Sequence, residues 1–338
     1  MFNMKAIRPF LCLNAPFLPA QQLAASIIDV ATTRGVNKHK LLRGTGIFSE
    51  DLIQGKTLRA EQVLALMARA QTHTAGNDCA FQVGRRLFPG NYGYLSNALL
   101  HCTHFGEALR LLTRFKMQIC PFIFATRFDD DKQLYLGLQD SLGCGDQWQF
   151  ILEIYCTALV SASKLLLGQR IPFHFDFPFA RPKHIQEYEE NLGYRLGFSQ
   201  PQLRIRVDKE WLNKPFIQQS QNLKRHSIYQ AQQQQTYQHG FLDAVRLALV
   251  NAPQSNLQQV ATLFQTSPAT FKRKLKQHGQ SFQQIHDEQR RQQAILLLNV
   301  QGLNNEQSAQ RMDFDDVPNF RRAVKRWTGL TPSQLRGV

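Results

Sequence analysis

The boundaries of one short helix can be read directly from residues 267 to 279 of this chain. Ser267 accepts hydrogen bonds from the first free N–H groups of a helix, and Pro268 fits the first helical position. Gly279 suits the left-handed conformation that ends many helices. Between them, the stretch FKRKLKQHG keeps Phe271 and Leu275 four positions apart. The pattern predicts a short amphipathic helix whose outer face is cationic.

A second helix is expected just before this one. The stretch LQQVATLF follows Asn256 and places its apolar residues at positions i, i+3, i+4 and i+7. Only the turn QTS separates it from the cationic helix, which is the layout of a helix-turn-helix. In such a unit the second helix enters the major groove by its first residues. The outward residues are therefore predicted to contact DNA: Ala269, Thr270, Lys272, Arg273 and Lys276.

The same arrangement recurs further along the chain. A helix over NNEQSAQRM, begun by Asn304 or Asn305, precedes the turn DFDD and a helix over VPNFRRAVKRW, which we expect Asp315 to cap. The inward residues of this last helix are apolar, and Arg321 and Asn319 are predicted to reach the second groove. Arg322 and Lys325 are predicted to contact phosphate or to form internal pairs. A merely solvated charged face accounts for one such cluster, but poorly for two capped ones.

Overall charge agrees with a polyanionic partner. The 338 residues carry a formal net charge of +15, which suits nucleic acid or an anionic membrane surface. The apolar runs ICPFIFA and IPFHFDFPFA are short and broken by proline, so a membrane span is not expected. The N-terminus lacks a clear signal-peptide cleavage site. The sequence therefore favours a cytoplasmic protein that makes no membrane contact.

The chain changes character near residue 216. Upstream it is rich in Phe, Leu, Gly and Cys, whereas Gln218 to Gln238 is a glutamine-rich stretch that could be a helix, a tether or a fraying helix. We predict one domain over 1–215, a connector over 216–240 and a DNA-binding domain over 241–338.

The upstream part shows both helical and strand periodicity. Helices are expected around Leu23–Val30, Val63–Ala68, CAFQVGRRL, GEALRLLTRF, Trp148–Leu167 and HIQEYEENL. Strands are expected on both sides of Asp129–Asp131, in IPFHFDF and in QLRIRV. The predicted fold is an α+β N-terminal domain with a small antiparallel sheet, followed by an all-α C-terminal domain with two helix-turn-helix units.

Residues 241–338 resemble the DNA-binding domain of the AraC-type transcription regulators. The resemblance rests on SPATFKRKLKQHGQSFQQIHDEQRRQQAILLL and FRRAVKRWTGLTPSQLR. The upstream stretches NDCAFQVGRRLFPGNYGYLSNALLHCTHFGEALRLLTRF and YEENLGYRLGF are similar to the sensing domain of the branch that includes ornithine-utilisation regulators. The resemblance implies a regulator, and activation is the habit of this family. The implied partners are promoter DNA, a small-molecule effector, RNA polymerase and a second copy of the chain.

Three positions depart from the family pattern, all in the second unit. Ser308 stands where a large aliphatic residue is usual, Asp313 where the turn usually has glycine, and Val324 where Phe is usual. Asp adopts the left-handed conformation only at some cost. We therefore expect the second unit to bind DNA more weakly than the first.

The remaining signals are weaker. Six cysteines without a CxxC pair predict reduced thiols, and the pair His101 and His104 near Cys102 lacks a third metal ligand, so packing is favoured. Arg204, Arg206, Lys224 and Arg225 are interpreted as surface residues. The clustered phenylalanines are mainly core, although some could line an effector pocket, whose residues we do not assign. No motif for an enzyme, a cofactor or a metal is found. The alternatives are an effector-independent regulator with a structural N-terminal domain and, less favoured, an enzyme with a DNA-targeting tail.

Overall fold

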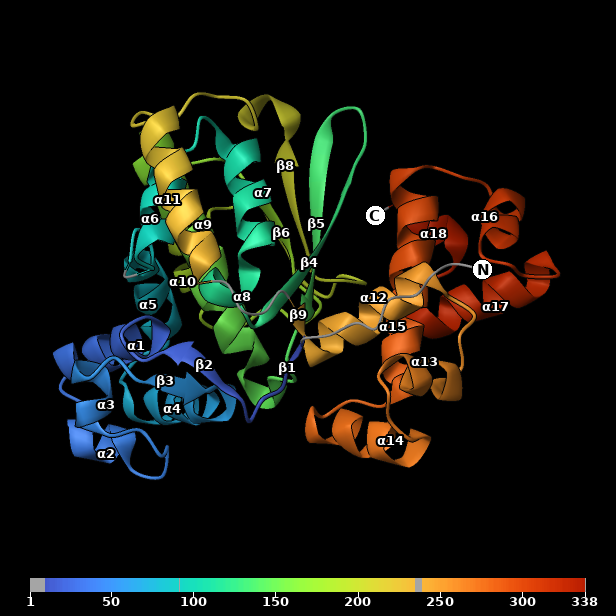
Figure 1. Ribbon diagram of the computed structural model, residues 1–338. Helices are drawn as coiled ribbons and strands as arrows, with labels where there is room; N and C mark the ends of the chain where they lie inside the picture. Colours follow the sequence, from blue (N-terminus) through green and yellow to red (C-terminus); the bar gives the residue numbers. More distant parts are fainter. Residues whose placement is uncertain (1–9, 91, 235–238, 338) are drawn as a thin grey trace.

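The chain divides into a sheet-containing N-terminal region and a helical C-terminal region (Figure 1). The computed structural model describes residues 10–90, 92–234 and 239–337. In Figure 1 the N-terminal region lies on the left, and the C-terminal helices form a separate group on the right. The predicted α+β and helical classes of the two parts are confirmed.

The N-terminal region begins with short helices around a two-stranded antiparallel sheet, β2 (Pro16–Pro19) with β3 (Thr57–Arg59). The helices are α1 (Leu23–Thr33), α2 (Lys38–Leu42), α3 (Ser49–Ile53), α4 (Ala60–His73), α5 (Cys79–Leu87), α6 (Tyr94–Leu100), α7 (Phe105–Arg114) and α8 (Lys116–Ile119). The predictions for α1, α4, α5 and α7 are confirmed, and their predicted and observed ends differ by at most five residues.

A five-stranded sheet with the order β4-β5-β8-β6-β7 forms the middle of this region. Its strands are β4 (Ile123–Asp129), β5 (Gln133–Asp140), β6 (His174–Asp176), β7 (Leu196–Gly197) and β8 (Arg204–Asp208). The sheet was expected to be antiparallel, but β6 and β7 run parallel. The reason is α10 (Ile185–Leu192), which carries the chain back between them as a crossover, so that both strands point the same way.

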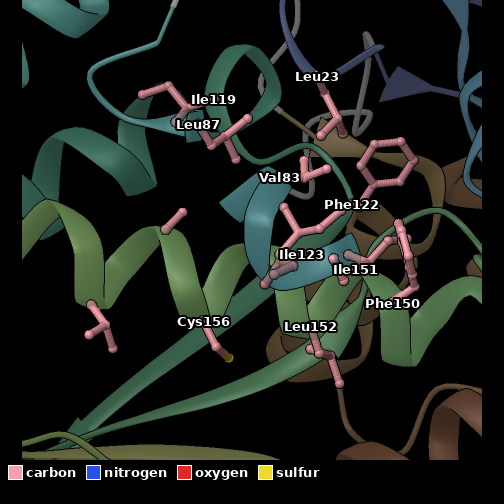
Figure 2. Packing of buried hydrophobic residues seen from close by; sticks show 14 of the residues in the cluster. Leu23, Val83, Leu87, Ile119, Phe122, Ile123, Phe150, Ile151, Leu152 and Cys156 are labelled. Atoms are coloured by element: carbon pink, nitrogen blue, oxygen red, sulfur yellow. The ribbon is translucent and has the colours of Figure 1, made fainter. Parts of the chain in front are cut away.

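Helix α9 (Trp148–Leu167) is the central helix of the N-terminal core. Figure 2 shows Ile151, Leu152 and Cys156 of α9 among side chains from α5 and from the start of β4. With the preceding turn of 3-10 helix, Gly145–Gln147, it is the one helix of the described chain long and apolar enough to cross a membrane. Because 56% of its most apolar window is buried inside the protein, its apolar character is accounted for by the core.

The glutamine-rich segment contains a helix, α11 (Gln221–Gln233), which packs along α6. Its inner side buries Lys224, Ser227 and Ala231, and Asn97 of α6 donates a hydrogen bond to Ser227 over 2.7 Å. Residues 235–238 of the predicted connector lie outside the described residues. Of the three alternatives for this segment, a packed helix is therefore the one observed for Gln221–Gln233.

The C-terminal region consists of seven described helices and one π-helical segment. They are α12 (Phe241–Asn251), α13 (Leu257–Leu263), α14 (Pro268–Gln277), α15 (Phe282–Ile295), the π segment Leu296–Val300, α16 (Asn305–Arg311), α17 (Val317–Thr328) and α18 (Pro332–Arg336). Two separate apolar clusters hold these helices together. We call α12–α14 with the start of α15 the first bundle, and the end of α15 with α16–α18 the second bundle.

The N-terminal strand crosses to the first bundle. β1 (Phe10–Leu11) pairs in parallel with β9 (His239–Gly240), the strand that leads into α12. The ring of Phe10 lies 5.5 Å from that of Phe241 and 5.3 Å from that of Phe264, measured between centroids. The first residues described thus complete the core of a bundle that begins more than 200 residues later.

Candidate DNA-binding interface

The first bundle contains two helices joined by a tight turn. Asn256 caps α13 by accepting a hydrogen bond from the backbone of Gln259, and Ser267 caps α14 by accepting one from Thr270. Gln265, in the turn, has a φ of +53°, and the N–H of Thr266 returns to the carbonyl of Ala261. The caps and the left-handed turn residue together fix where α14 starts and which way it leaves α13.

The outer face of α14 is cationic and open. Phe271 and Leu275 are each 1% exposed and face the core of the first bundle. The five residues predicted to contact DNA are all exposed: Ala269, Thr270, Lys272, Arg273 and Lys276. Within the described residues, none of the three cations among them forms an ion pair. Lys274, by contrast, lies over the rings of Phe10 and Phe241, with its Nζ 4.7 and 5.4 Å from their centroids.

The second bundle repeats this local plan. Asn304 caps α16, and Asp313 in the following turn has a φ of +56°, matching the left-handed geometry expected at that position. The cap of α17 is Asp316, which accepts a hydrogen bond from the backbone of Asn319 over 2.6 Å. The prediction that Asp315 caps this helix was wrong by one residue, because Val317 rather than Asp316 takes the first helical position.

The outer face of α17 is also exposed, but its side chains are partly tied to one another. All four predicted DNA-contacting residues are exposed: Asn319, Arg321, Arg322 and Lys325. Asn319 donates to the carboxylate of Asp316 over 2.6 Å and accepts from Arg322 over 2.7 Å. Two of the four side chains are therefore held in an internal network, as the sequence suggested for Arg322, whereas no such bond holds Arg321 or Lys325 in the described residues.

The core of the second bundle contains one buried defect. Ser308 is fully buried, and its hydroxyl oxygen has no hydrogen-bond partner in the described residues. A buried hydroxyl without a partner costs about 1–3 kcal/mol. Val324, also fully buried, fills less space than the aromatic residue usual in the family. Both features leave the core of the second bundle less well filled, and the expectation that this unit binds DNA more weakly stays a prediction.

The cavity described between helices of the N-terminal region is small for an effector. Phe122, Phe173, Phe175 and Phe177, from the stretches considered for a pocket, are at most 1% exposed and belong to the core. One cavity, of about 10 Å³, lies between α1, α4 and α9 and includes Leu23, Val63, Tyr92, Ile119 and Tyr155 in its wall. This is room for about one water molecule. The hydroxyl of Tyr92 there has no partner in the described residues.

The histidines considered for a metal serve the fold. His104 caps α7 by accepting a hydrogen bond from the N–H of Glu107, and the ring of His101 bonds the carbonyl of Gln218 over 2.6 Å. Cys102 is fully buried, and burial raises its pKa to about 12. The six cysteines are all free thiols, four of them buried.

The interpretation of the cations near the connector as surface residues was wrong for two of the four. Arg204 is 4% exposed and its Nε lies 2.8 Å from the carboxylate of Asp176, which also binds Arg206. Lys224 is 5% exposed and lies 2.5 Å from the carboxylate of Glu107. Arg225 is exposed, as expected. Sequence periodicity alone does not reveal a buried cation, because its partner lies far away in the chain.

The comparisons with known proteins match both regions. Residues 35–216 match the arabinose-binding N-terminal domain of the AraC transcription regulator, and residues 260–337 match a helix-turn-helix domain. The chain is 26% identical to the ornithine utilization regulator of Pseudomonas aeruginosa, covering 93% of this chain and 94% of that protein. It is 24% identical to an uncharacterized HTH-type transcriptional regulator of Mycobacterium tuberculosis, with 91% and 93% covered. The crystal structure of the transcriptional regulator CdpR from Pseudomonas aeruginosa aligns with a TM-score of 0.41 at 18% identity, covering 93% of this chain and 98% of that one.

These matches are to transcription regulators and not to enzymes. The sensing-domain model alone spans more than half of the chain, and the helix-turn-helix model spans most of the C-terminal region in which both basic faces lie. The chain therefore belongs to the AraC-type transcription regulators, with an arabinose-binding type of N-terminal domain and a helix-turn-helix DNA-binding domain.

Proposed function

We propose that both bundles are helix-turn-helix units and that α14 and α17 enter two major grooves of promoter DNA. The observation that carries this proposal is the pair of capped, turn-separated helices whose predicted contact residues are all exposed. In the first unit Lys272 and Arg273 are assigned to the groove, with Ala269 and Thr270 beside base edges or thymine methyls and Lys276 nearby. In the second, Asn319 and Arg321 read bases, and Arg322 and Lys325 lie nearer phosphate.

The chain is proposed to act in the cytoplasm as an activator that works with RNA polymerase, with no membrane contact. Its N-terminal region, over 1–215, senses a small molecule and forms the contact between two copies, and 241–338 is the DNA-binding domain. The support is the family to which the chain belongs and the match of residues 35–216 to an effector-binding domain. Effector binding then favours one arrangement of the two regions over another.

The experiment that tests this function is genome-wide mapping of bound sites, followed by footprinting on the strongest fragment. Replacing Lys272 and Arg273 together by Ala should weaken binding at least tenfold, because base-edge contacts of this kind contribute about 1–3 kcal/mol each. If either side chain also meets a phosphate, its removal should lower the salt dependence by about 0.9 log units per log unit of salt. Lys38→Ala with Arg43→Ala, two exposed cations of the N-terminal region, is the matched control. Equal weakening in both double variants would contradict the assignment.

An effector-independent regulator with a structural N-terminal region is the second candidate. The cavity beside Tyr92 favours it, because about 10 Å³ is far below the size of ordinary ligand sites. Its wall also contains no charged side chain, so it is unsuited to an amino acid. A ligand that binds the folded chain raises its melting temperature. A rise with L-ornithine, the compound in the name of one relative, would favour an effector site that opens on binding, whereas no rise with it or with other small metabolites favours the second candidate.

A further inference from the structure

The N-terminal region is bonded to the first bundle through a buried carboxylate. Asp243, in the first turn of α12, is fully buried and accepts the Nζ of Lys116, the hydroxyl of Ser141 over 2.6 Å and the N–H of Gly240 over 3.0 Å. Lys116 is 8% exposed and Ser141 fully buried. The bond to Gly240 closes the start of α12, and the other two come from the N-terminal region. The same carboxylate therefore serves the helix and the contact between regions.

The loop that carries Ser141 makes two more bonds to the first bundle. Arg246, 1% exposed, donates to the carbonyl of Asp140 over 2.5 Å. His278, at the end of α14, donates from its ring Nδ1 to the carbonyl of Leu142 over 2.6 Å. Burial lowers the pKa of His278, so its ring is neutral near pH 7 and the carbonyl fixes its proton on Nδ1. The loop is thus bonded to α12 and to the C-cap residue of the proposed recognition helix.

Close backbone packing makes this contact specific. A Cβ added to Gly143 would overlap the carbonyl oxygen of His278, and one added to Gly240 would lie 2.9 Å from the carbonyl oxygen of Ser141. The carboxylate of Asp140 holds the loop in shape by accepting the N–H groups of Leu142 and Gly143 over 3.0 and 2.8 Å. The two regions therefore meet along fitted main chain and not only through long side chains.

The second bundle has its own, smaller contact with the N-terminal region. Arg204 donates to the side chain of Asn299 over 2.7 Å, and Asn299 in turn donates to the carbonyl of Leu335 in α18 over 3.0 Å. Asn299 belongs to the π segment, a helix irregularity that is frequently found at functional sites. Arg204 is anchored by Asp176 on the other side. The bundles are also bonded to each other directly, since Gln254, between α12 and α13, donates to the carboxylate of Asp313 over 3.2 Å.

We propose that Lys116 and Arg204 are positioning residues for DNA binding, Lys116 acting on the first unit through Asp243 and Arg204 on the second through Asn299. This inference rests on the proposed function of both bundles. In the bonded arrangement the predicted DNA-contacting residues of both units remain exposed, so the contacts hold the units without covering them. A unit held in its binding orientation loses less freedom on meeting DNA and binds more tightly.

The test is footprinting of the full chain on a mapped site with two half-sites. Lys116→Met should weaken protection at the half-site of the first unit about tenfold, within the usual range of coupling between sites, and leave the second half-site unchanged. Asn299→Ala should weaken protection at the half-site of the second unit and leave the first half-site unchanged. Lys116→Arg, which keeps the positive charge, should retain most of the protection at the first half-site. Lys209→Met, which removes a partly exposed cation paired with Asp129 within the N-terminal region, is the matched control.

Lys116→Met with Asp243→Asn distinguishes positioning from mere stability. Lys116→Met leaves the buried carboxylate of Asp243 paired, within the described chain, only with the more distant Arg246, whose Nη1 lies 3.9 Å away, whereas removing both charges relieves most of that penalty. We expect the double variant to regain the melting temperature of the parent chain while first-site protection stays weak. If DNA binding returns together with stability, or if Lys116→Met weakens both half-sites equally, the inference is overturned. If the parent chain itself protects no DNA, the proposed function fails instead.

Discussion

Single residues of the second bundle show how the helix-turn-helix pattern tolerates departures. Ser308 is a buried hydroxyl at a position that usually holds an aliphatic side chain, and Asp313 takes the left-handed turn conformation that glycine adopts without strain. The turn of the first bundle does the same with Gln265, at a φ of +53°. The geometry is therefore retained in both turns without glycine, at some cost in stability.

Ser308→Ala should stabilise the chain. The substitution removes the unpaired hydroxyl and improves helix propensity, so we expect the free energy of unfolding to rise by about 1 kcal/mol. Ser267→Ala is the matched control with the opposite sign, because it removes the cap of α14 and should cost about 1 kcal/mol. Urea denaturation measures both. A decrease in stability in Ser308→Ala would mean that its hydroxyl has a partner after all.

Arg273→Ala should weaken DNA binding more than Arg321→Ala. The first unit has an apolar core, and within the described part of the chain no hydrogen bond joins the predicted contact side chains Lys272, Arg273 and Lys276, whereas the second unit has the defect at Ser308. We expect about a tenfold weakening for Arg273→Ala, near the magnitude of one base contact, and a smaller effect for Arg321→Ala. Gel-shift titration at one fixed salt concentration gives the comparison. An equal or larger effect of Arg321→Ala contradicts the idea of a weaker second unit.

At the scale of elements, helix ends were the most predictable feature. Ser267, Pro268, Gly279, Ser281 and Gly329 act where their chemistry predicts, because a cap depends on residues within one turn. The error at Asp315 arose where Asp315 and Asp316 compete for one cap. Strand direction was less predictable, since the parallel pair β6–β7 depends on a crossover and not on local pattern.

The packing of α11 includes an ion pair with α7, between the buried Lys224 and Glu107, and this contribution should be sensitive to acid. Burial alone would raise the pKa of Glu107, but hydrogen bonds from Lys224 and Thr103 outweigh it and lower the pKa to about 2. A carboxyl group with a depressed pKa stabilises the fold fully above its ordinary pKa of 4.5, and this contribution is lost as the pH falls toward 2.

Lys224→Met should therefore reduce the change in melting temperature between pH 4.5 and 2. The parent chain should lose stability between pH 4.5 and 2, and the variant should start lower and lose less, because Glu107 without its cation titrates nearer its ordinary pKa. Melting curves at several pH values measure the difference. Lys209→Met is again the control, since its pair with Asp129 is partly exposed. Parallel curves for the parent chain and Lys224→Met would refute the role of this pair.

The whole molecule contains features that local patterns in the sequence did not reveal. The contact of Lys116 with Asp243, the bond of His278 to Leu142 and the crossing of Phe10 all join residues more than 100 positions apart. A single sequence does not indicate which distant residue a basic or apolar side chain will contact. The class of each region and the exposed faces of α14 and α17 were predictable because they follow from periodicity and caps within one element.

Phe10→Ala should destabilise the first bundle, although Phe10 lies at the opposite end of the sequence. Its ring contacts Phe241 and Phe264 and lies under the Nζ of Lys274. Truncating a partly buried phenylalanine should lower the free energy of unfolding by about 2 kcal/mol, somewhat less than for a fully buried one. Phe48→Ala, at 66% exposure, is the control and should change little. Equal stabilities of the two variants would show that the ring of Phe10 contributes nothing to that core.

The position of Phe10 also bears on how the protein is made. During synthesis this ring leaves the ribosome more than 200 residues before its neighbours Phe241 and Phe264. The first bundle cannot be finished from its own segment, and expressing residues 241–338 alone would leave a gap where the aromatic ring belongs. Final closure of the first bundle must then wait for Phe10 to reach Phe241 and Phe264.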